Sequence, residues 1–502
     1  MIKRVKDVAS RLLPPLGTTV PLTQAAWIFF LVALPVTSFP FFPSGLGGGT
    51  LVRPLSIYPM LVLGLVAILP RLIVGRLPRS LLALLPFLLV AFASTAFSLL
   101  RGIETGQEVG VIERAARALA TLALGAAMYF TVAIIPRTLA ELRAALRWLY
   151  IGFALALFWG SLQVVYILHF SPGWFRLLNT LQKFVSIRRL FDNRVSGLTY
   201  EPNWFADQIS FLLLPFLLAA VVSDYTVFRW RWRRLTVEWI LLIWAAVVLV
   251  FTFSRAGLFL FLASAFLTVL LRPRHKKAIG ASRLKREVVL RRMVEGALIV
   301  VVLAAGIYFA GTKNTYFTRL WKYWQRTPDA GYAAYLAGYF EYIGFGARFI
   351  YWETAYRMYL DYPLMGVGLG NYAFYFAEHI PFSPLLATPE VERILVPEEG
   401  RDRLITSKNF YLRILSETGL AGAATFLAFF VAVVGCALYL WFTPRLEQKF
   451  WGRAAVLGIC TFGLVAFSFD SLAIPNMWVV FGFITVAAHV SSAPQSPDPL
   501  SS

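Results

Sequence analysis

Cysteine is nearly absent from this sequence of 502 residues, and its two cysteines, Cys436 and Cys460, both lie inside apolar runs. Neither belongs to a CxxC pair or to a metal-binding spacing, so neither redox nor metal chemistry is indicated. Histidine is also scarce, with four residues in the whole chain. We expect no metal and no cofactor.

Charged residues make up only 15% of the chain, whereas a soluble globular chain has about 25%. Hydrophobic residues reach 59% and the mean hydropathy is +0.68, which predicts an integral membrane protein. The net charge of +21 would suggest nucleic acid in a soluble protein. Here the basic residues cluster in short segments between apolar runs, as membrane topology requires, so no nucleic-acid partner is expected.

Apolar runs of membrane length recur from end to end, which predicts an all-α integral membrane protein with about twelve transmembrane helices. A bilayer core of about 30 Å needs about 20 apolar residues per helix. The run 412–442 is longer than that, and we expect it to begin outside the bilayer. A tight turn near Asp470 is expected between the last two runs. The twelve segments are 22–42, 54–75, 80–100, 115–136, 146–169, 204–222, 236–253, 255–272, 292–311, 412–442, 453–470 and 471–490.

The lysines and arginines predict the orientation, because cytoplasmic connections carry an excess of them. With a cytoplasmic N-terminus, the inner segments carry 26 of these residues and the short outer connections carry four. Both chain ends then lie in the cytoplasm. The apolar run after the basic N-terminal segment lacks a small-residue cleavage site, so we interpret it as an uncleaved first span.

Four segments follow from this topology. Nine spans occupy 1–312, with one outer loop at 170–203. A large outer helical loop, 313–411, separates the ninth and tenth spans, and 412–490 holds the last three. The tail 491–502 is rich in serine and proline and is predicted to be a disordered cytoplasmic segment.

Three arginines fall on the predicted outer side, each flanked by apolar or aromatic residues: Arg194, Arg255 and Arg348. Arg194 lies on a turn that contains Gly197, and Arg255 lies between two apolar runs with almost no loop. Arginine suits bidentate recognition of phosphate and stays charged when it is desolvated, so the three could form an anion site. Alternatively, each snorkels to the interface or pairs with an acid such as Glu201.

The outer loop 313–411 contains a predicted helix and a glycine-rich turn. Aromatic residues at helical spacing over 346–361 predict an amphipathic helix on the outer interface. Tyr362-Pro363 ends it, and three glycines spaced two apart follow. These are not a dinucleotide-binding fingerprint, because no strand precedes them. The rings of the loop could pack against sugars or form an interfacial aromatic belt.

Four motifs, taken in order, resemble the O-antigen ligase and O-antigen polymerase superfamily of bacterial polysaccharide assembly. The likeness is close over about 190–425, and elsewhere it rests on the twelve-span layout. The motifs are Arg194-Val-Ser-Gly197 with Glu201-Pro202-Asn203, then Ser254-Arg255, then Arg348 with Trp352 and Asp361-Tyr-Pro-Leu-Met-Gly-Val-Gly-Leu-Gly-Asn371, and finally Asn409-Phe-Tyr-Leu412 with Glu417-Thr-Gly419.

The resemblance implies a membrane glycosyltransferase of the bacterial inner membrane that acts in lipopolysaccharide biosynthesis. Its donor would be an oligosaccharide on undecaprenyl diphosphate, used at the outer face without a metal. Membrane lipid would surround it, and a polysaccharide chain-length regulator is a further partner to consider. The diphosphate-binding arginines of the family carry over to Arg194 and Arg348, which are the expected catalytic cations, and to Arg255.

One position departs from the family pattern. Ligases have a histidine beside the asparagine of the last motif, proposed to activate the acceptor hydroxyl, and here that residue is Lys408. A protonated lysine is a poor general base. The candidate bases are therefore His379, Glu201 and Glu353, and Lys408 is a further candidate contact for the diphosphate.

The departure favours a polymerase, which transfers the growing glycan onto the next lipid-linked repeat unit. A ligase, which transfers the glycan to lipid A-core or to a protein, is the alternative. A transporter of lipid-linked glycans is a hypothesis of another class. Asp207 and Asp470 are its candidate intramembrane residues, but both fall near outer ends of spans, and no inverted repeat is visible.

Overall fold

The computed structural model describes residues 21–42, 51–74, 79–103, 109–233, 235–272, 282–312, 314–325, 332–381, 389–395, 404–443 and 446–492. The basic N-terminal segment, part of the basic connection 272–292 and the tail beyond residue 492 lie outside these ranges. The described chain is mainly helical, because a helix satisfies its own backbone polar groups in an apolar environment.

The helices of the first half are α2 (Pro21–Ala33), α3 (Ile57–Leu63), α4 (Leu69–Val74), α5 (Leu85–Leu100), α6 (Val111–Ile134), α7 (Leu139–Leu168), α8 (Pro172–Gln182), α9 (Pro202–Asp207) and α10 (Leu214–Ser223). Those of the second half are α11 (Val237–Phe251), α12 (Arg255–Leu270), α13 (Ser282–Gly311), α14 (Arg319–Lys322), α15 (Tyr332–Tyr342), α16 (Gly346–Asp361), α17 (Tyr372–His379), α18 (Pro389–Leu395), α19 (Phe410–Phe442), α20 (Leu446–Val465) and α21 (Pro475–Ser492).

Short segments of other helix types join some of these. Two are π-helical, η2 (Gly64–Ile68) and η4 (Gln208–Leu213), and two are 3₁₀ turns, η3 (Arg79–Leu84) and η5 (Tyr323–Gln325). Strands β1 (Arg231–Trp232) and β2 (Leu235–Thr236) form a small antiparallel hairpin.

Within the described ranges, six continuous helical stretches are long and apolar enough to cross a membrane: Ser80–Leu100, Val111–Ile134, Leu139–Leu168, Pro202–Ser223, Val289–Gly311 and Phe410–Phe442. The shorter apolar helices are Pro21–Ala33, Ile57–Arg71, Val237–Phe251 and Arg255–Leu270. The chain is thus an all-α membrane protein. The count of twelve spans stays a prediction.

The structure corrects two local expectations. The first apolar run is helical only as far as Ala33, and an isolated bridge pairs Ser38 with Arg53 beyond it. The connection near Asp470 is not a tight turn, because α20 ends at Val465 and α21 begins at Pro475. Proline at the first helical position favours this later start.

Helix α21 forms the centre of the bundle and packs against α6, α19 and α20. Its residues from Pro475 to Ala488 are all buried. It approaches α6 closely at two glycines. A Cβ on Gly482 would lie 2.8 Å from Val132, and a Cβ on Gly125 would overlap the Trp478 indole. Small residues at such contacts are typical of helix packing in membranes.

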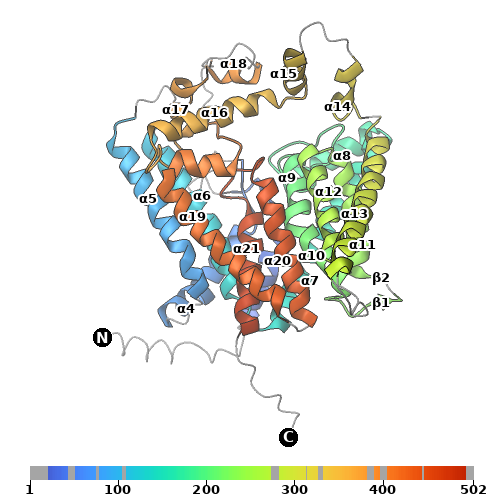
Figure 1. Ribbon diagram of the computed structural model, residues 1–502. Coiled ribbons are helices and arrows are strands. Elements are labelled where there is room, and N and C mark those ends of the chain that lie inside the picture. The colour runs from blue at the N-terminus through green and yellow to red at the C-terminus, as the bar shows by residue number, and fades with distance from the viewer. Residues whose placement is uncertain are drawn as a thin grey trace.

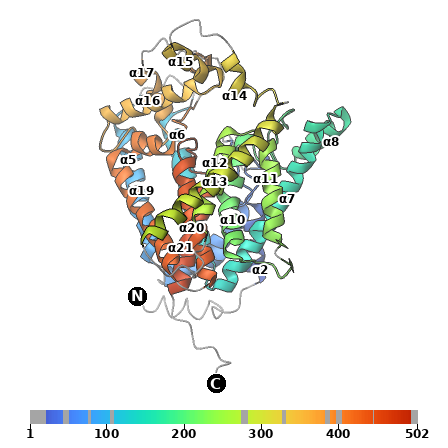
Figure 2. The same ribbon diagram turned by 45° about the vertical axis from the view of Figure 1, so that its right-hand side comes forward.

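The short helices α14 to α18 lie over one end of the bundle, and we call them the cap (Figure 1). Helix α4 and the β1–β2 hairpin lie at the opposite end (Figure 1). Within the cap, α16 packs against both α17 and α19. Helix α8 extends outward from the side of the bundle at the cap end (Figure 2).

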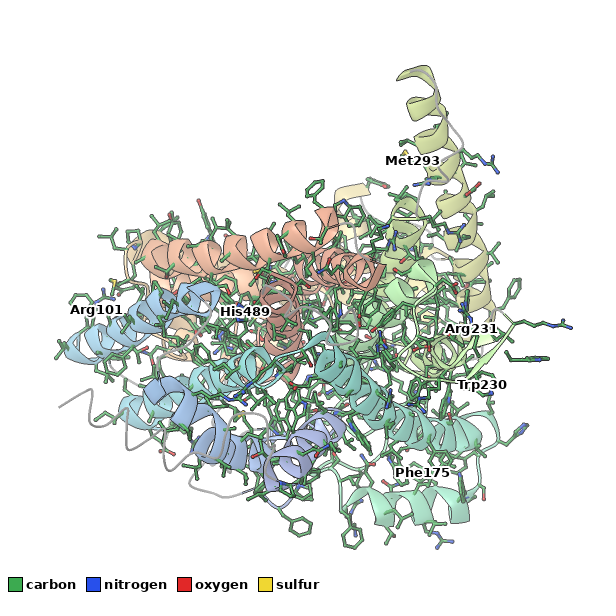
Figure 3. The ribbon with its side chains drawn as sticks, turned by 90° about the horizontal axis from the view of Figure 1, so that it is seen from below. Arg101, Phe175, Trp230, Arg231, Met293 and His489 are labelled. Atoms are coloured by element: carbon green, nitrogen blue, oxygen red, sulfur yellow. The ribbon has the colours of Figure 1, made fainter. Side chains whose placement is uncertain are left out.

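The periphery exposes apolar side chains, as a membrane protein requires. Only 11% of the residues in the most apolar part of Val289–Gly311, on α13, are buried. Seen from the end opposite the cap, α13 extends away from the other helices and carries Met293, while Trp230 and Arg231 point outward from the hairpin region (Figure 3). Leu298 and Val302 are also exposed on α13. We interpret this helix as lipid-facing.

Candidate functional site

Arg194 lies in the connection between α8 and α9 and is only 8% exposed. Its Nε donates to the carbonyl oxygen of Thr252 at 2.8 Å, and a terminal nitrogen donates to Oδ1 of Asn203 at 2.8 Å. The turn depends on Gly197, whose φ is +56° and where a Cβ would lie 2.7 Å from the Phe205 ring. The guanidinium is therefore fixed on a turn directly before α9.

Arg255 begins α12, and the ring of Tyr316 links it to Arg194. The Cζ of Arg194 lies 4.3 Å from the centroid of this ring, and the Cζ of Arg255 lies 4.9 Å from it. Arg255 also donates to the carbonyl oxygen of Ile343 at 2.6 Å, just before α16 begins. Two arginines from separate connections thus share one aromatic partner.

Arg194 and Arg255 carry positive charge without an acidic ion-pair partner in the described part of the chain. Burial lowers the pKa of Arg194 from its ordinary value, and the charge of Arg255 acts in the same direction. Tyr316 and Glu201 oppose the shift. Arginine nevertheless stays protonated at physiological pH, so the structure holds two like charges close together.

Arg348 lies in the first turn of α16. A terminal nitrogen donates to the carbonyl oxygen of Lys408 at 3.4 Å, and Cζ lies 5.9 Å from the centroid of the Phe345 ring. Arg348 also acts electrostatically on Asp207, the last residue of α9. Since Asn203 of α9 holds Arg194, the structure brings the three predicted arginines to the same end of the bundle.

Lys408 is held at three points. Its backbone, at a φ of +50°, donates from N to Oδ2 of Asp470 at 2.8 Å. Its Nζ donates to Oε1 of Glu390 at 2.8 Å and lies 4.8 Å from the centroid of the Tyr351 ring. The Tyr351 hydroxyl donates to the same Oε1, also at 2.8 Å. Lys408, just before α19, is therefore ion-paired with a residue of the cap and is not a free amine.

The two predicted glutamates each have a basic partner. Glu201 pairs with Arg188 at 2.9 Å, and Glu353 pairs with Arg357, one helical turn further along α16, at 2.7 Å. Both carboxylates are partly exposed, at 37% and 43%. Glu201 acts electrostatically on Arg194, whereas Glu353 lies on the flank of α16 that carries exposed Arg357.

His379 ends α17 and is nearly buried, at 9% exposure. Its Nε2 lies 3.0 Å from Oδ2 of Asp361, and its Nδ1 lies 2.8 Å from the carbonyl oxygen of Tyr375. Both ring nitrogens therefore face acceptors. Asp361 ends α16, about 20 Å along the helix axis from Arg348, so the structure does not bring His379 together with the arginines.

The predicted helix over 346–361 is confirmed as α16. Its buried face differs from the predicted aromatic stripe, because small and aliphatic residues such as Ala347, Ile350 and Met358 are buried while Tyr356 is 50% exposed. Trp352 and Phe349 pack on each other within the cap, with centroids 5.8 Å apart. The close approach of α16 to α19 and α17 explains the small residues.

The glycine-rich turn docks onto a break in α19. Gly419 interrupts this helix with φ +63° and ψ −165°. Such a break leaves backbone groups without helical partners, and residues 363–368 supply them. Leu420 N donates to Pro363 O at 2.8 Å, and Gly368 N donates to Glu417 O at 2.9 Å. The run 412–442 is thus two helical segments joined at this break, rather than one long span.

A buried ion pair lies beside the break. Arg413 Nε donates to Oε2 of Glu417 at 3.1 Å, and their side chains are 8% and 0% exposed. Gly370 N donates to the same Oε2 at 2.9 Å. Another nitrogen of Arg413 donates to Asp470 O at 2.6 Å. Since Asp470 also binds the Lys408 amide, this network fixes the connection that carries Lys408.

Sequence reasoning did not single out Tyr316, Tyr351 or Glu390. A local signal existed for Glu390, because Thr-Pro-Glu is a helix-start pattern that places an acid in the first turn. Tyr316 and Tyr351 had no local signal, since both are tyrosines in a loop rich in aromatic residues. Their importance comes from contacts with distant segments.

No cluster of three or more histidine, cysteine, aspartate or glutamate side chains suited to a metal ion occurs among the described residues. The described site brings together arginine cations, the carboxylates of Glu201 and Glu390, which interact electrostatically with them, and the Tyr316 ring.

The bundle of apolar helices with three arginines at its cap end defines a membrane protein with positive charge concentrated at that end. The family comparison agrees, since residues 240–427 match the family model described as O-antigen ligase. Over these residues the chain is similar to the O-antigen ligase family, in agreement with the resemblance of its motifs. The match includes Arg255, Arg348 and Lys408, and Arg194 precedes it. No curated protein matches the chain.

Proposed function

We propose that this protein is a polymerase that transfers a growing glycan from undecaprenyl diphosphate onto a lipid-linked repeat unit. The reaction takes place at the outer face of the bacterial inner membrane, on the side of the cap, with both chain termini in the cytoplasm. The family supports a membrane glycosyltransferase that uses lipid-linked glycans. The acceptor, the lipid carrier and the orientation are parts of the proposal.

The observation that carries the proposal is the pair of guanidiniums on the Tyr316 ring. Two unit charges a few ångströms apart repel each other, by about 1 kcal/mol in water and more near a protein surface. A diphosphate placed between Arg194 and Arg255 turns this repulsion into attraction. Arginine forks match phosphate oxygens bidentately, so the pair is suited to this ligand.

The same cations favour the reaction, not only the binding. As the bond between the sugar and the diphosphate breaks, the leaving group gains negative charge. Fixed cations aimed at it then stabilise the transition state more than the ground state. Arg348 is assigned as the third cation, since it lies at the same end of the bundle and its partner in the structure is a neutral carbonyl.

The state of Lys408 supports a polymerase rather than a ligase. Ligases are expected to carry a histidine base at this position. Here the side chain is a cation whose Nζ is ion-paired with Glu390 at 2.8 Å, so it does not reproduce that role. Lys408 stays a candidate contact for the diphosphate.

The predicted bases Glu201, Glu353 and His379 remain proposals of lesser support. Each is paired in the structure, with Arg188, Arg357 and Asp361 respectively.

A ligase is the second candidate, because the matched family model carries that description. Loss of a polymerase and loss of a ligase should leave different glycan products in cells. Loss of a polymerase should leave single repeat units attached to the final acceptor, whereas loss of a ligase should leave long chains on undecaprenyl diphosphate. A deletion strain analysed for both products, with and without a chain-length regulator, decides between them.

The direct test uses purified protein in vesicles with a repeat unit linked to undecaprenyl diphosphate. We expect the wild-type chain to form longer glycans and Arg194→Ala, Arg255→Ala and Arg348→Ala each to lower the rate about 10²- to 10³-fold. Arg176→Ala is the matched control, since Arg176 is an exposed arginine of α8 that donates to a main-chain carbonyl of residue 172, four residues earlier. Unchanged rates in all three arginine variants would refute the assigned site.

A further inference from the structure

Glu390 lies in the first turn of α18 and is about half exposed, with 49% of its side-chain surface accessible. Two donors from different elements converge on one of its oxygens. Tyr351 of α16 and Lys408, just before α19, both donate to Oε1 at 2.8 Å. The other oxygen, Oε2, has no hydrogen-bond partner in the described part of the chain.

This arrangement fixes the carboxylate and leaves one oxygen open. The Nζ of Lys408 also lies over the Tyr351 ring, 4.8 Å from its centroid, so the two donors support each other. Tyr351 is fully buried and its backbone carbonyl accepts from the Tyr372 hydroxyl at 2.7 Å. The Lys408 amide is held by Asp470. Glu390 is therefore held in place through Oε1, and its Oε2 is left open.

The carboxylate also lies within the electrostatic reach of Arg348, whose guanidinium donates to the Lys408 carbonyl. A cation assigned to the leaving diphosphate and a carboxylate with an open oxygen are thus neighbours at the cap end. Glycosyl transfer needs these two groups beside each other: one stabilises the departing phosphate, and the other receives a proton from the incoming hydroxyl.

We propose that Glu390 is the general base of the transfer, accepting the proton of the acceptor hydroxyl on Oε2, with Lys408 and Tyr351 as positioning residues. This inference rests on the proposed function. The acceptor oxygen forms the new bond to the anomeric carbon while its proton moves to Glu390. The bond from that carbon to the phosphate oxygen breaks, and its electron pair leaves with undecaprenyl diphosphate, held by the arginines.

The charges around Glu390 keep its carboxyl group ionised, which is the form that can accept a proton. Burial raises the pKa of this carboxyl, but Lys408, Tyr351 and Arg348 together outweigh burial, so the pKa lies below its ordinary value. Glu390 is therefore ionised at neutral pH. The rate should fall in acid as Glu390 becomes protonated, and this acid limb should be absent when the side chain cannot titrate.

The test compares Glu390→Gln and Glu390→Asp with the wild-type chain in vesicles. Glu392→Gln is the matched control, because Glu392 is an exposed glutamate in the same first turn of α18. Two readouts are needed: the rate of glycan transfer as a function of pH, and the affinity for undecaprenyl diphosphate without a glycan.

We expect Glu390→Gln to lower the transfer rate by about 10²- to 10⁴-fold and to lose the acid limb, with the affinity for undecaprenyl diphosphate unchanged. Glu390→Asp should restore part of the rate, and Glu392→Gln should match the wild type. Retained affinity shows that the variants are folded. An active wild type with an equally active Glu390→Gln would overturn the role of Glu390 and leave the proposed function standing. A wild type that neither transfers glycan nor binds undecaprenyl diphosphate would overturn both.

Discussion

Arg413 and Glu417 form an ion pair one helical turn apart, 3.1 Å between Nε and Oε2, in a place where both side chains are buried. The pair lies next to the break in α19 and touches both the glycine-rich turn and the Asp470 connection. It therefore joins three segments that position the cap. Its removal tests how far the candidate site depends on buried charge.

We expect Glu417→Ala to destabilise the protein by about 3–5 kcal/mol, because Arg413 would remain buried without its partner. The check is thermal unfolding in detergent or in vesicles. Replacing both residues together, as Arg413→Met with Glu417→Leu, should cost much less, since no uncompensated charge is left. Equal losses in the single and double variants would contradict this account.

Gly419→Ala should destabilise the break in α19. Its φ of +63° with ψ −165° is a region that essentially only glycine adopts, and a Cβ would overlap the Leu364 carbonyl oxygen. We expect a loss of about 1–3 kcal/mol for the backbone strain, with reduced transfer activity. Gly435→Ala is the control, since Gly435 lies in the same helix with open space where its Cβ would be. That variant should be as stable as the wild type.

Tyr316→Leu should weaken binding of undecaprenyl diphosphate although every arginine is still present. A cation over an aromatic ring is worth about 0.5–2 kcal/mol, and this ring orients two guanidiniums at once. We expect a loss of affinity of about tenfold. Tyr316→Phe keeps the ring and should lose less, so an equal loss in both variants would point to the hydroxyl instead. Equilibrium binding to vesicles that contain the lipid measures both.

Lys408→Met should move the acid limb of the pH–rate profile to higher pH. Lys408 lowers the pKa of Glu390, so its removal raises that pKa, and Glu390 becomes protonated at a higher pH. The same pair contributes stability that is present above the unfolded-state pKa of the carboxyl and is lost as pH falls through the lowered folded-state value. An acid limb that does not move in Lys408→Met would contradict the assigned pairing. Transfer rates measured across the acid range, with Glu392→Gln beside them, provide the check.

The sequence predicts the helical membrane class, the helix 346–361 and the glycine-rich turn, because each depends on local composition or spacing. It also indicates Arg194, Arg255 and Arg348, which the structure brings to one end of the bundle. The sequence could not predict which residues contact these arginines. Tyr316 and Glu390 reach the site through contacts between segments far apart in the chain, and hydrophobic periodicity does not record such contacts.

Contacts between distant segments also explain why the structures of α19 and α16 differ from the prediction. The apolar run 412–442 is continuous, so nothing local marks Gly419 as a break. The break exists because residues 363–368 supply the missing backbone partners. On α16, the spacing of aromatic residues is helical, but the buried face is set by how closely α17 and α19 approach.

Several arginines at the cap end bind main-chain carbonyl oxygens: Arg194 binds Thr252, Arg255 binds Ile343, Arg348 binds Lys408 and Arg413 binds Asp470. A carbonyl acceptor is present whatever side chain the residue carries. Residue identity at two of these acceptor positions, those of Thr252 and Ile343, is thus free to change during evolution without loss of the bond, provided that the backbone path stays the same. The orientation of Arg194 and Arg255 therefore depends at these two points on the backbone path and not on the side chain of the acceptor residue.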